Sequence, residues 1–407
     1  MVSKTVLKIS ILVVLLALAF GITTTYLSLS DPKAQNIDKE KLVNQIVESI
    51  KNESLDNVSN LNISSSSSTS STSSVEGVED SYQTLTPNID PTTVLEVAGY
   101  IADFAFKPGL TTLKNNLGSF NSVSPVWYSL DPKVSTGLAK RNTTANKELL
   151  TLAKKNSIEV IPSIAQFEYS DLSAVLNDEK KRNAHINEIV KVVKTNSYAG
   201  IDLDYENIAE TDKDNFQIFI TSLHEKLQKD NKKLIVTVLA KDFTNENGSP
   251  TRRAQDWKFL GENADQVRIM VYDYQNIEKQ IYNISPIKEI EDVIKYAQAK
   301  IPNEKISIGL PLYAYSYLDG KKTALTYKDI QNIRAKQKVI SDEMDIVNKE
   351  KIITYEANGK TIIAYYTDAE VDNERRNLLK NMGITKMFYW RLGENMRKEV
   401  NQYLSFH

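Results

Sequence analysis

The sequence predicts a (β/α)8 barrel, also called a TIM barrel, behind an N-terminal membrane or signal segment and a disordered linker. From Thr92 to His407, eight short apolar runs rich in β-branched residues follow one another, and helical patterns fill most of the intervals between them. This alternation is typical of a TIM barrel. An open doubly wound sheet is the second choice.

The N-terminus has the layout of a secretion signal. Lys4 and Lys8 precede an apolar run from Ile9 to Ile22. Its weakly polar continuation to Leu27 makes a stretch of about 20 residues, close to the length that spans a bilayer. We expect residues 1–30 to be a signal anchor or a signal peptide. The rest of the chain would then be extracytoplasmic, either on a single-pass protein of the cell membrane or secreted.

Residues 31–91 are predicted to be a flexible linker. Residues 64–74 consist only of Ser and Thr, a composition that cannot build a core. Apolar residues between Leu42 and Ile50 recur at helical spacing, which predicts one short amphipathic helix.

Residues 92–407 are predicted to form the barrel. Alternating runs at 351–366 surround Asn358–Gly359, which predicts a β-hairpin, and the interval 313–383 is predicted to hold it as a small α+β insertion between strands seven and eight. Helical patterns are clearest at 183–196 and 214–230. The predicted strands are 97–106, 124–130, 158–167, 198–206, 233–240, 266–274, 305–313 and 384–392.

The composition excludes several classes of function. The formal net charge is −2, so no overall field attracts nucleic acid. The chain has no cysteine and three widely spaced histidines, so we expect no disulfide and no metal site. Because no phosphate-binding glycine motif is present either, we expect no cofactor. We expect the barrel domain to be monomeric.

Residues 199–206, "AGIDLDYE", place three carboxylates on one strand. Asp202, Asp204 and Glu206 lie at i, i+2 and i+4, so they share a face, which in a barrel is the interior. Like charges this close raise at least one pKa, and a carboxylic acid that stays protonated near neutral pH can act as a general acid. Taken alone, the pattern equally fits a solvated acidic edge strand.

Motifs at four predicted strand ends change that balance. "GIDLDYE" is followed in order by "IMVYDY" (269–274), "IGLPLYAYSY" (308–317) and "FYWRLG" (388–393). Together they resemble glycoside hydrolase family 18, the chitinase-like barrels, and especially its bacterial branch. The resemblance covers nearly all of residues 95–398 and implies a glycosidase.

The family motif D-x-x-D-x-D-x-E implies roles for the carboxylates. Glu206 matches the proton donor, Asp204 the group that orients the substrate N-acetyl group, and Asp202 the partner of Asp204. The implied reaction is retaining hydrolysis in which the substrate acetamido oxygen, not an enzyme group, attacks the anomeric carbon. Tyr272 matches a tyrosine that holds the acetamido group.

The resemblance also implies substrate-binding residues. Asp273 and Tyr274 match neighbours on the same rim, and Trp390 matches the indole under the sugar next to the cleaved bond. Tyr313 at the mouth of strand seven and Gln166 at the end of strand three are expected to contact the sugar. The alternative to sugar contact for Trp390 and Tyr313 is ordinary packing. For Tyr272 and Asp273 the alternative is a capped strand end.

Trp127 and Tyr128 either line the cleft or pack in the core.

The sequence departs from the family pattern twice. Ala199 stands where the outermost Asp would fall, which we expect to remove a negative neighbour of Asp202. Ala165 and Gln166, in "SIAQ", stand where many relatives have glycine, so the cleft floor is expected to be reshaped. Glu206 and Asp204 are intact, yet the two changes keep an inactive protein under consideration.

Two functions follow from the sequence. The first is an extracytoplasmic glycosidase that acts on polysaccharide with N-acetylated sugars, such as peptidoglycan or chitin. The second is an inactive, chitinase-like glycan-binding protein at the surface. Because inactive relatives usually lose the terminal Glu, the presence of Glu206 favours the first.

Overall fold

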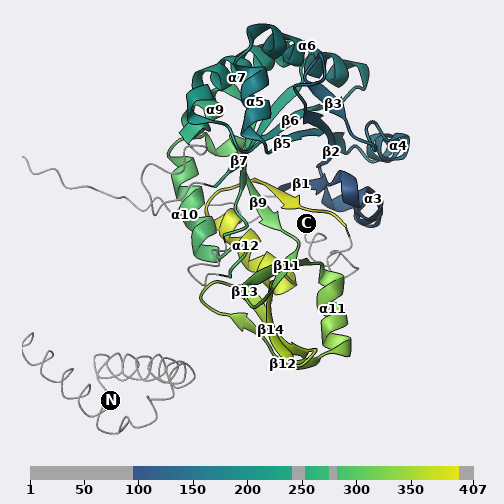
Figure 1. Cartoon of the computed structure of the whole chain (residues 1–407), viewed down its shortest axis with the longest axis vertical. Helices are drawn as coiled ribbons and strands as arrows, with labels where there is room; N and C mark the ends of the chain where they lie inside the picture. The colour runs from purple at the N-terminus through teal and green to yellow at the C-terminus, as the bar shows by residue number, and fades with distance from the viewer. Residues whose placement is uncertain (1–94, 241–252, 275–281, 394–407) are drawn as a thin grey trace, which may run out of the picture. The chain divides into compact units, whose positions relative to one another are not determined.

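The computed structural model describes residues 95–240, 253–274 and 282–393 (Figure 1). Contacts divide the chain into two units, Met1–Tyr82 and Gln83–His407, and the first lies wholly outside the described residues. The segments predicted at 1–30 and 31–91 also fall outside them and stay predictions. Among the described helices, none is long and apolar enough to cross a membrane.

The described residues form a closed parallel barrel. Strands pair in the order β1, β15, β9, β8, β7, β6, β5 and β2, and β1 also pairs with β2, which closes the ring. β3 (Leu138–Lys140) adds to β2 in antiparallel direction, and β4 (Glu159–Val160) adds to it in parallel. The barrel strands are β1 (Glu96–Ile101), β2 (Ser122–Leu130), β5 (Ser163–Gln166), β6 (Gly200–Tyr205), β7 (Lys233–Leu239), β8 (Gln266–Met270), β9 (Ile306–Pro311) and β15 (Lys386–Trp390).

Helices surround the strands (Figure 1). α6 illustrates how local sequence sets such an element: Asp178 caps its first turn by accepting bonds from Lys180 N and Lys181 N, and Ile186 and Ile189 on one face are buried. The barrel helices are α3 (Phe106–Asn115), α4 (Lys147–Lys155), α5 (Tyr169–Leu176), α6 (Glu179–Thr195), α7 (Lys213–Gln228), α9 (Trp257–Asn263), α10 (Ile287–Gln298) and α12 (Ala369–Asn381). Short 3-10 turns are η2 (Asp103–Ala105), η3 (Leu117–Ser119), η4 (Glu210–Asp212) and η5 (Asn303–Lys305).

Each of the eight predicted strands overlaps an observed barrel strand, and two predictions differ clearly from it. The first prediction, 97–106, is too long, because β1 ends at Ile101 and α3 already begins at Phe106. The third, 158–167, is divided into β4 and β5 around Pro162, which has no N–H to donate to the ladder.

The insertion between β9 and β15 is larger than a hairpin. It forms a five-stranded sheet in the order β11, β10, β14, β13, β12, gathered with α11 (Tyr327–Lys336) at the lower end of Figure 1. The predicted pair 351–366 corresponds to β13 and β14, which pair from Lys351↔Tyr366 to Ala357↔Lys360. The remainder of the predicted interval, α12, packs on α10 and belongs to the barrel. The strands are β10 (Ala314–Leu318), β11 (Lys321–Leu325), β12 (Lys338–Asp345), β13 (Glu350–Ala357) and β14 (Lys360–Tyr366).

A buried ion pair fastens the insertion to the barrel. Glu350, at the start of β13, lies 2.9 Å from Arg375 of α12. Glu350 Oε1 also accepts the backbone N–H of Ser285 at 2.6 Å, and Ser285 Oγ bonds the Val271 carbonyl just beyond β8. Because the pair carries these additional hydrogen bonds, its burial is tolerated. The insertion thereby supports Val271, the residue before Tyr272.

Apolar side chains form separate layers outside and inside the sheet. The outer layer, between strands and helices, contains Trp127 and Tyr128, because a register shift between Val126 and Tyr128 alters the alternation of β2. The Trp127 ring packs on Tyr198 at 5.8 Å, so both β2 aromatics are core residues. The inner layer consists of Ala98, Tyr100, Val126, Ala165, Met270 and Phe388, with Leu239, Tyr272 and Trp390 against it.

The inner layer leaves no room for a side chain at Gly309 of β9. A Cβ at this position would lie 2.3 Å from Cζ of Phe388, whose ring is buried against Tyr100. Gly309→Ala should therefore lower the free energy of unfolding by about 1–3 kcal/mol, measured by denaturant unfolding. Gly118→Ala is the matched control, because its Cβ would meet nothing within 4 Å. Equal stability of the two variants would contradict this packing.

Candidate active site

Strand β6 carries the acidic residues toward the barrel mouth. Asp202 and Asp204 lie within β6 and are buried, whereas Glu206 follows its last residue and is half-buried. The alternate residues Ile201, Leu203 and Tyr205 belong to the outer apolar layer. The three carboxylates therefore share the inner face at the C-terminal ends of the strands, as strand periodicity predicts.

Asp202 lies deepest and is held by side chains from other strands. Tyr100 of β1 donates its hydroxyl to Asp202 Oδ2 at 2.6 Å, and Thr237 of β7 donates to Oδ1 at 2.7 Å. Arg268 of β8 places Nη1 3.8 Å from Oδ2. These groups compensate a carboxylate that would otherwise be costly to bury.

The two outer carboxylates are shifted toward their protonated forms. Burial raises the pKa of Asp204 well above its usual range, and the Glu206 and Asp202 carboxylates add to the effect. Burial, followed by repulsion from Asp273, raises the pKa of Glu206 to about 7. Asp204 Oδ1 is buried and has no hydrogen-bond partner among the described residues. Near neutral pH, this group of acids therefore retains protons.

The chain after β8 brings a phenol and another carboxylate beside these acids. Burial raises the pKa of Tyr272 well above its usual range, and the Asp204 carboxylate is the next cause, so Tyr272 stays a hydrogen-bond donor. Asp273 follows with φ of +58°, a conformation that Asp tolerates better than most residues. Its Oδ1 accepts the Tyr313 hydroxyl at 2.6 Å. The rings of Tyr272 and Tyr313 meet edge to face at 6.2 Å.

Trp390 lies beside the same group of residues. It is the last residue of β15, half-buried, with its ring 5.6 Å from that of Tyr100, the residue that bonds Asp202. The indole and the acids thus come together from strands far apart in the chain.

Tyr274 and Gln166, both predicted to contact the substrate, have different surroundings. Tyr274 is 40% exposed on the rim, and its backbone N–H bonds the Ile284 carbonyl. The Gln166 amide is occupied within the protein: Nε2 donates to Leu130 O and Asp171 Oδ2, and Oε1 accepts backbone N–H groups. Since all four of its bonding positions are in use, Gln166 orders the loop after β5. Its contact with a sugar stays a prediction.

The expected effect of Ala199 is wrong. Ala199 precedes β6, and its odd position places it in register with Ile201 and Leu203 rather than with Asp202. Its backbone N–H bonds Val160 O on neighbouring β4. An Asp at this position would therefore not have been an interior neighbour of Asp202.

Sequence reasoning missed the residues beneath Asp202. Tyr100, Thr237 and Arg268 all occupy inward positions of apolar strands, and Arg268 stands alone as a charge in "QVRIM". A single arginine at an inward position of a buried strand was the available signal.

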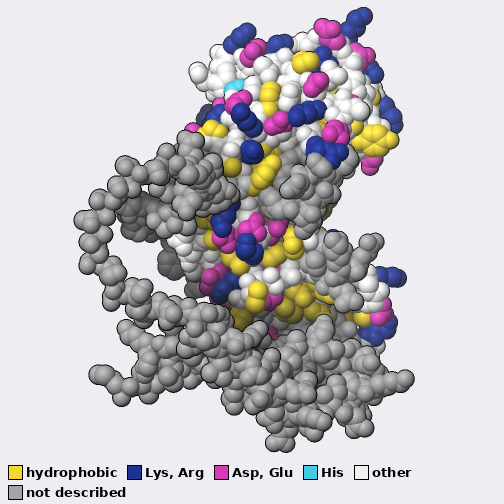
Figure 2. Space-filling view, turned by 90° about the vertical axis from the view of Figure 1, so that its left-hand side faces the viewer, with side chains coloured by type: hydrophobic (Ala, Val, Ile, Leu, Met, Phe, Trp, Pro, Cys, Tyr) yellow, Lys and Arg dark blue, Asp and Glu magenta, His cyan; other side chains and the backbone are white. Residues whose placement is uncertain are grey.

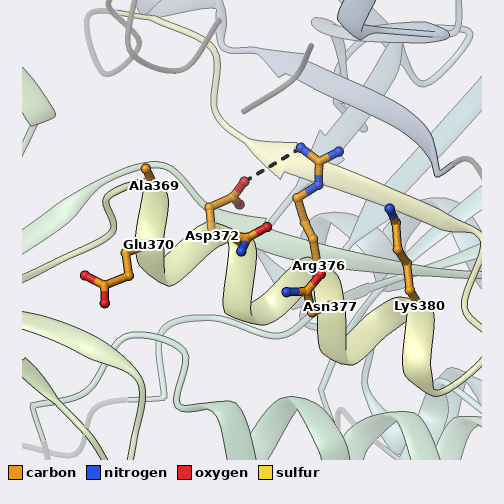
Figure 3. A pocket seen from close by; sticks show the side chains of 7 residues that line it. Ala369, Glu370, Asp372, Arg376, Asn377 and Lys380 are labelled. Atoms are coloured by element: carbon orange, nitrogen blue, oxygen red, sulfur yellow. Dashed lines mark ion pairs between the residues drawn. The ribbon is translucent and has the colours of Figure 1, made fainter. Parts of the chain in front are cut away.

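Hollows on the described surface also lie away from the β6 carboxylates. Figure 2 shows basic and acidic side chains interspersed over the described part of one face. A hollow lies along α12, lined by Ala369, Glu370, Asp372, Asn373, Arg376, Asn377 and Lys380 (Figure 3). Asp372 there is within 4.0 Å of Arg376 and accepts the Tyr389 hydroxyl. Because the side chains that line this hollow do not include the β6 carboxylates, we place the site at the barrel mouth.

Several curated proteins are similar to this chain. The chain is 25% identical over 277 residues to a cortical fragment-lytic enzyme of Bacillus anthracis, covering 66% of this chain and 64% of that protein. The chain spans between about half and two thirds of the curated relatives that it matches.

Solved structures share the fold. A chitinase of Chromobacterium violaceum superposes with a TM-score of 0.69 at 22% identity, over 77% of this chain and 100% of that one. The spore cortex-lytic enzyme SleL of Bacillus megaterium gives 0.65 at 23% identity, over 75% and 72%.

The family described as glycosyl hydrolases family 18 matches residues 97–395, which is well over half of the 407 residues. The chain belongs to glycosyl hydrolases family 18.

Proposed function

We propose that this chain is an extracytoplasmic glycoside hydrolase that cleaves β-linked, N-acetylglucosamine-containing polysaccharide. The observation that carries the proposal is the inward row Asp202, Asp204 and Glu206, in which burial and Asp273 raise the pKa of Glu206 to about 7. An acid with such a pKa is protonated often enough near neutral pH to donate to a glycosidic oxygen.

The proposed reaction is substrate-assisted and retains the anomeric configuration. Glu206 protonates the glycosidic oxygen while the acetamido oxygen of the substrate attacks the anomeric carbon. Asp204, whose Oδ1 has no described partner, accepts the acetamido N–H, and Tyr272 donates its hydroxyl to the acetamido oxygen. Water, activated by the Glu206 carboxylate, then opens the cyclic intermediate and restores the acid.

The remaining predicted residues would hold the sugar. Trp390 offers an aromatic face to the apolar side of the ring. Asp273, Tyr274 and Tyr313 line the rim beside it.

Peptidoglycan and chitin are the two substrate classes that we propose to compare. The similar proteins include a cortical fragment-lytic enzyme and a chitinase, which favours N-acetylated glycans for this chain as well. We propose that residues 1–30 direct the domain outside the cytoplasm and hold it at the membrane, where it acts as a monomer without a cofactor. The test is mass analysis of the products from chitin oligomers and purified peptidoglycan, side by side.

Replacing the proposed acid should abolish turnover without unfolding the barrel. Glu206→Gln should lower kcat/KM at least about 100-fold, since general acid catalysis contributes about 10²–10⁴-fold. Rates are measured as release of reducing ends, with Tm as the check on folding.

The control for this variant is Glu225→Gln, the same change at an exposed position of α7. It should keep both the rate and Tm. Near-normal turnover by Glu206→Gln would remove the proposed acid. Oligosaccharide binding by the native chain with no product over long incubation would favour the glycan-binding alternative.

The pH dependence should follow Glu206. Because the general acid must be protonated, kcat/KM should fall as pH rises through about 7. This fall is the basic limb of the pH profile. The negative charge of Asp273 raises the pKa of Glu206, so Asp273→Asn should move the basic limb to lower pH. We expect a shift of a few tenths of a unit to about one unit, smaller at high salt because Asp273 is exposed.

Glu168→Gln is the charge-matched control, since it also removes a negative charge from an exposed position after β5. It should leave the limb in place. A limb that moves upward in Asp273→Asn, or moves equally in both variants, would contradict the proposed coupling.

A further inference from the structure

The barrel interior contains one feature that the proposed reaction does not use. Arg268, on β8, is buried with only 1% of its surface exposed. Its Nη1 donates to Ser124 Oγ of β2 at 2.6 Å, and its guanidinium lies 5.3 Å from the ring centre of Tyr100 and 5.7 Å from that of Phe388. A fully buried guanidinium is rarely retained without a counter-charge.

Asp202 supplies that counter-charge. Its Oδ2 is 3.8 Å from Arg268 Nη1, and both side chains are essentially inaccessible to solvent. No other acidic side chain of the described residues lies within 4.0 Å of Arg268. We call Asp202 and Arg268 the inner charge pair.

Hydrogen bonds link Arg268, Tyr100, Thr237 and Asp202 into one buried group. A guanidinium can only donate, so the Tyr100 oxygen accepts from Arg268 Nη1 at 3.3 Å. The Tyr100 hydroxyl hydrogen then points to Asp202 Oδ2 at 2.6 Å, and that of Thr237 to Oδ1 at 2.7 Å. Each oxygen of Asp202 therefore has a hydroxyl within hydrogen-bond distance, and the two hydroxyls lie 2.8 Å from each other.

We propose that Arg268 is a positioning residue that holds Asp202 as a fixed anion at the base of the site, so that the exchangeable protons reside on Asp204 and Glu206. This inference rests on the proposed function for its catalytic meaning. Arg268 does not reach the substrate and acts through Tyr100 and Asp202. The titratable groups that act on the inner charge pair are Glu96, Tyr100 and Asp204. Glu206, Tyr272 and Asp273 act on Asp204, Tyr100 or one another instead.

The test is the pH profile of kcat/KM for Arg268→Met and Arg268→Lys, with a fluorogenic N-acetylglucosamine trisaccharide as substrate. Loss of the positive charge makes every nearby carboxyl hold its protons more tightly. The basic limb, which follows Glu206, should therefore move to higher pH in Arg268→Met. Arg268→Lys keeps the charge and should stay within a few tenths of a unit of the native profile. An unmoved basic limb in Arg268→Met, or an equal shift of that limb in both variants, would overturn the proposal.

A second measurement needs no turnover. Asp202→Asn and Arg268→Met each leave one buried charge unpaired, so each should lower Tm more than the double variant does. The charge pairing of Asp202 and Arg268 would be contradicted if the double variant lost as much Tm as the two single variants together. It would also be contradicted if all three variants failed to fold. If the native chain cleaves no glycan while this recovery of Tm is seen, the proposed function fails and the charge pair stands.

Discussion

The two-residue period of a strand within a closed sheet is the constraint on which this site depends. It sends Asp202, Asp204 and Glu206 to the interior and Ile201, Leu203 and Tyr205 to the layer beneath the helices. An interior filled with side chains is a poor solvent for charge, so the three acids cannot all ionise freely. The chemistry of the site is a consequence of this confinement.

Burial along β6 gives the carboxylates different properties. Asp202 is completely buried and accepts two hydroxyl bonds, Asp204 is buried with one oxygen that has no described partner, and Glu206 is half-buried at the mouth. The outer end is supported in turn by the chain after β8, where Ser285 links Val271 to the Glu350–Arg375 pair. The insertion thereby stabilises the neighbourhood of Tyr272.

Much of this arrangement could be predicted from the sequence, because strand spacing and the order of motifs are local properties. The eight strands and the inward row of acids follow from alternation and barrel closure, whereas Tyr272 and Trp390 were indicated by the resemblance to the family. The charge pairing of Arg268 could not be predicted, since it depends on which inward positions meet across the barrel. The occupied amide of Gln166 and the outer position of Trp127 depend on a loop turn and a strand bulge, which short motifs do not specify. The N-terminal segments remain predictions.

The central claim is that confinement at the barrel mouth raises the pKa of Glu206. The most direct measurement is a carbon-13 NMR titration of the chain labelled at glutamate side-chain carboxyls, with the Glu206 signal assigned by its loss in Glu206→Gln. The account predicts that this signal titrates at about pH 7. Titration near 4.3, the ordinary value for an exposed glutamate at about 25 °C, would contradict it.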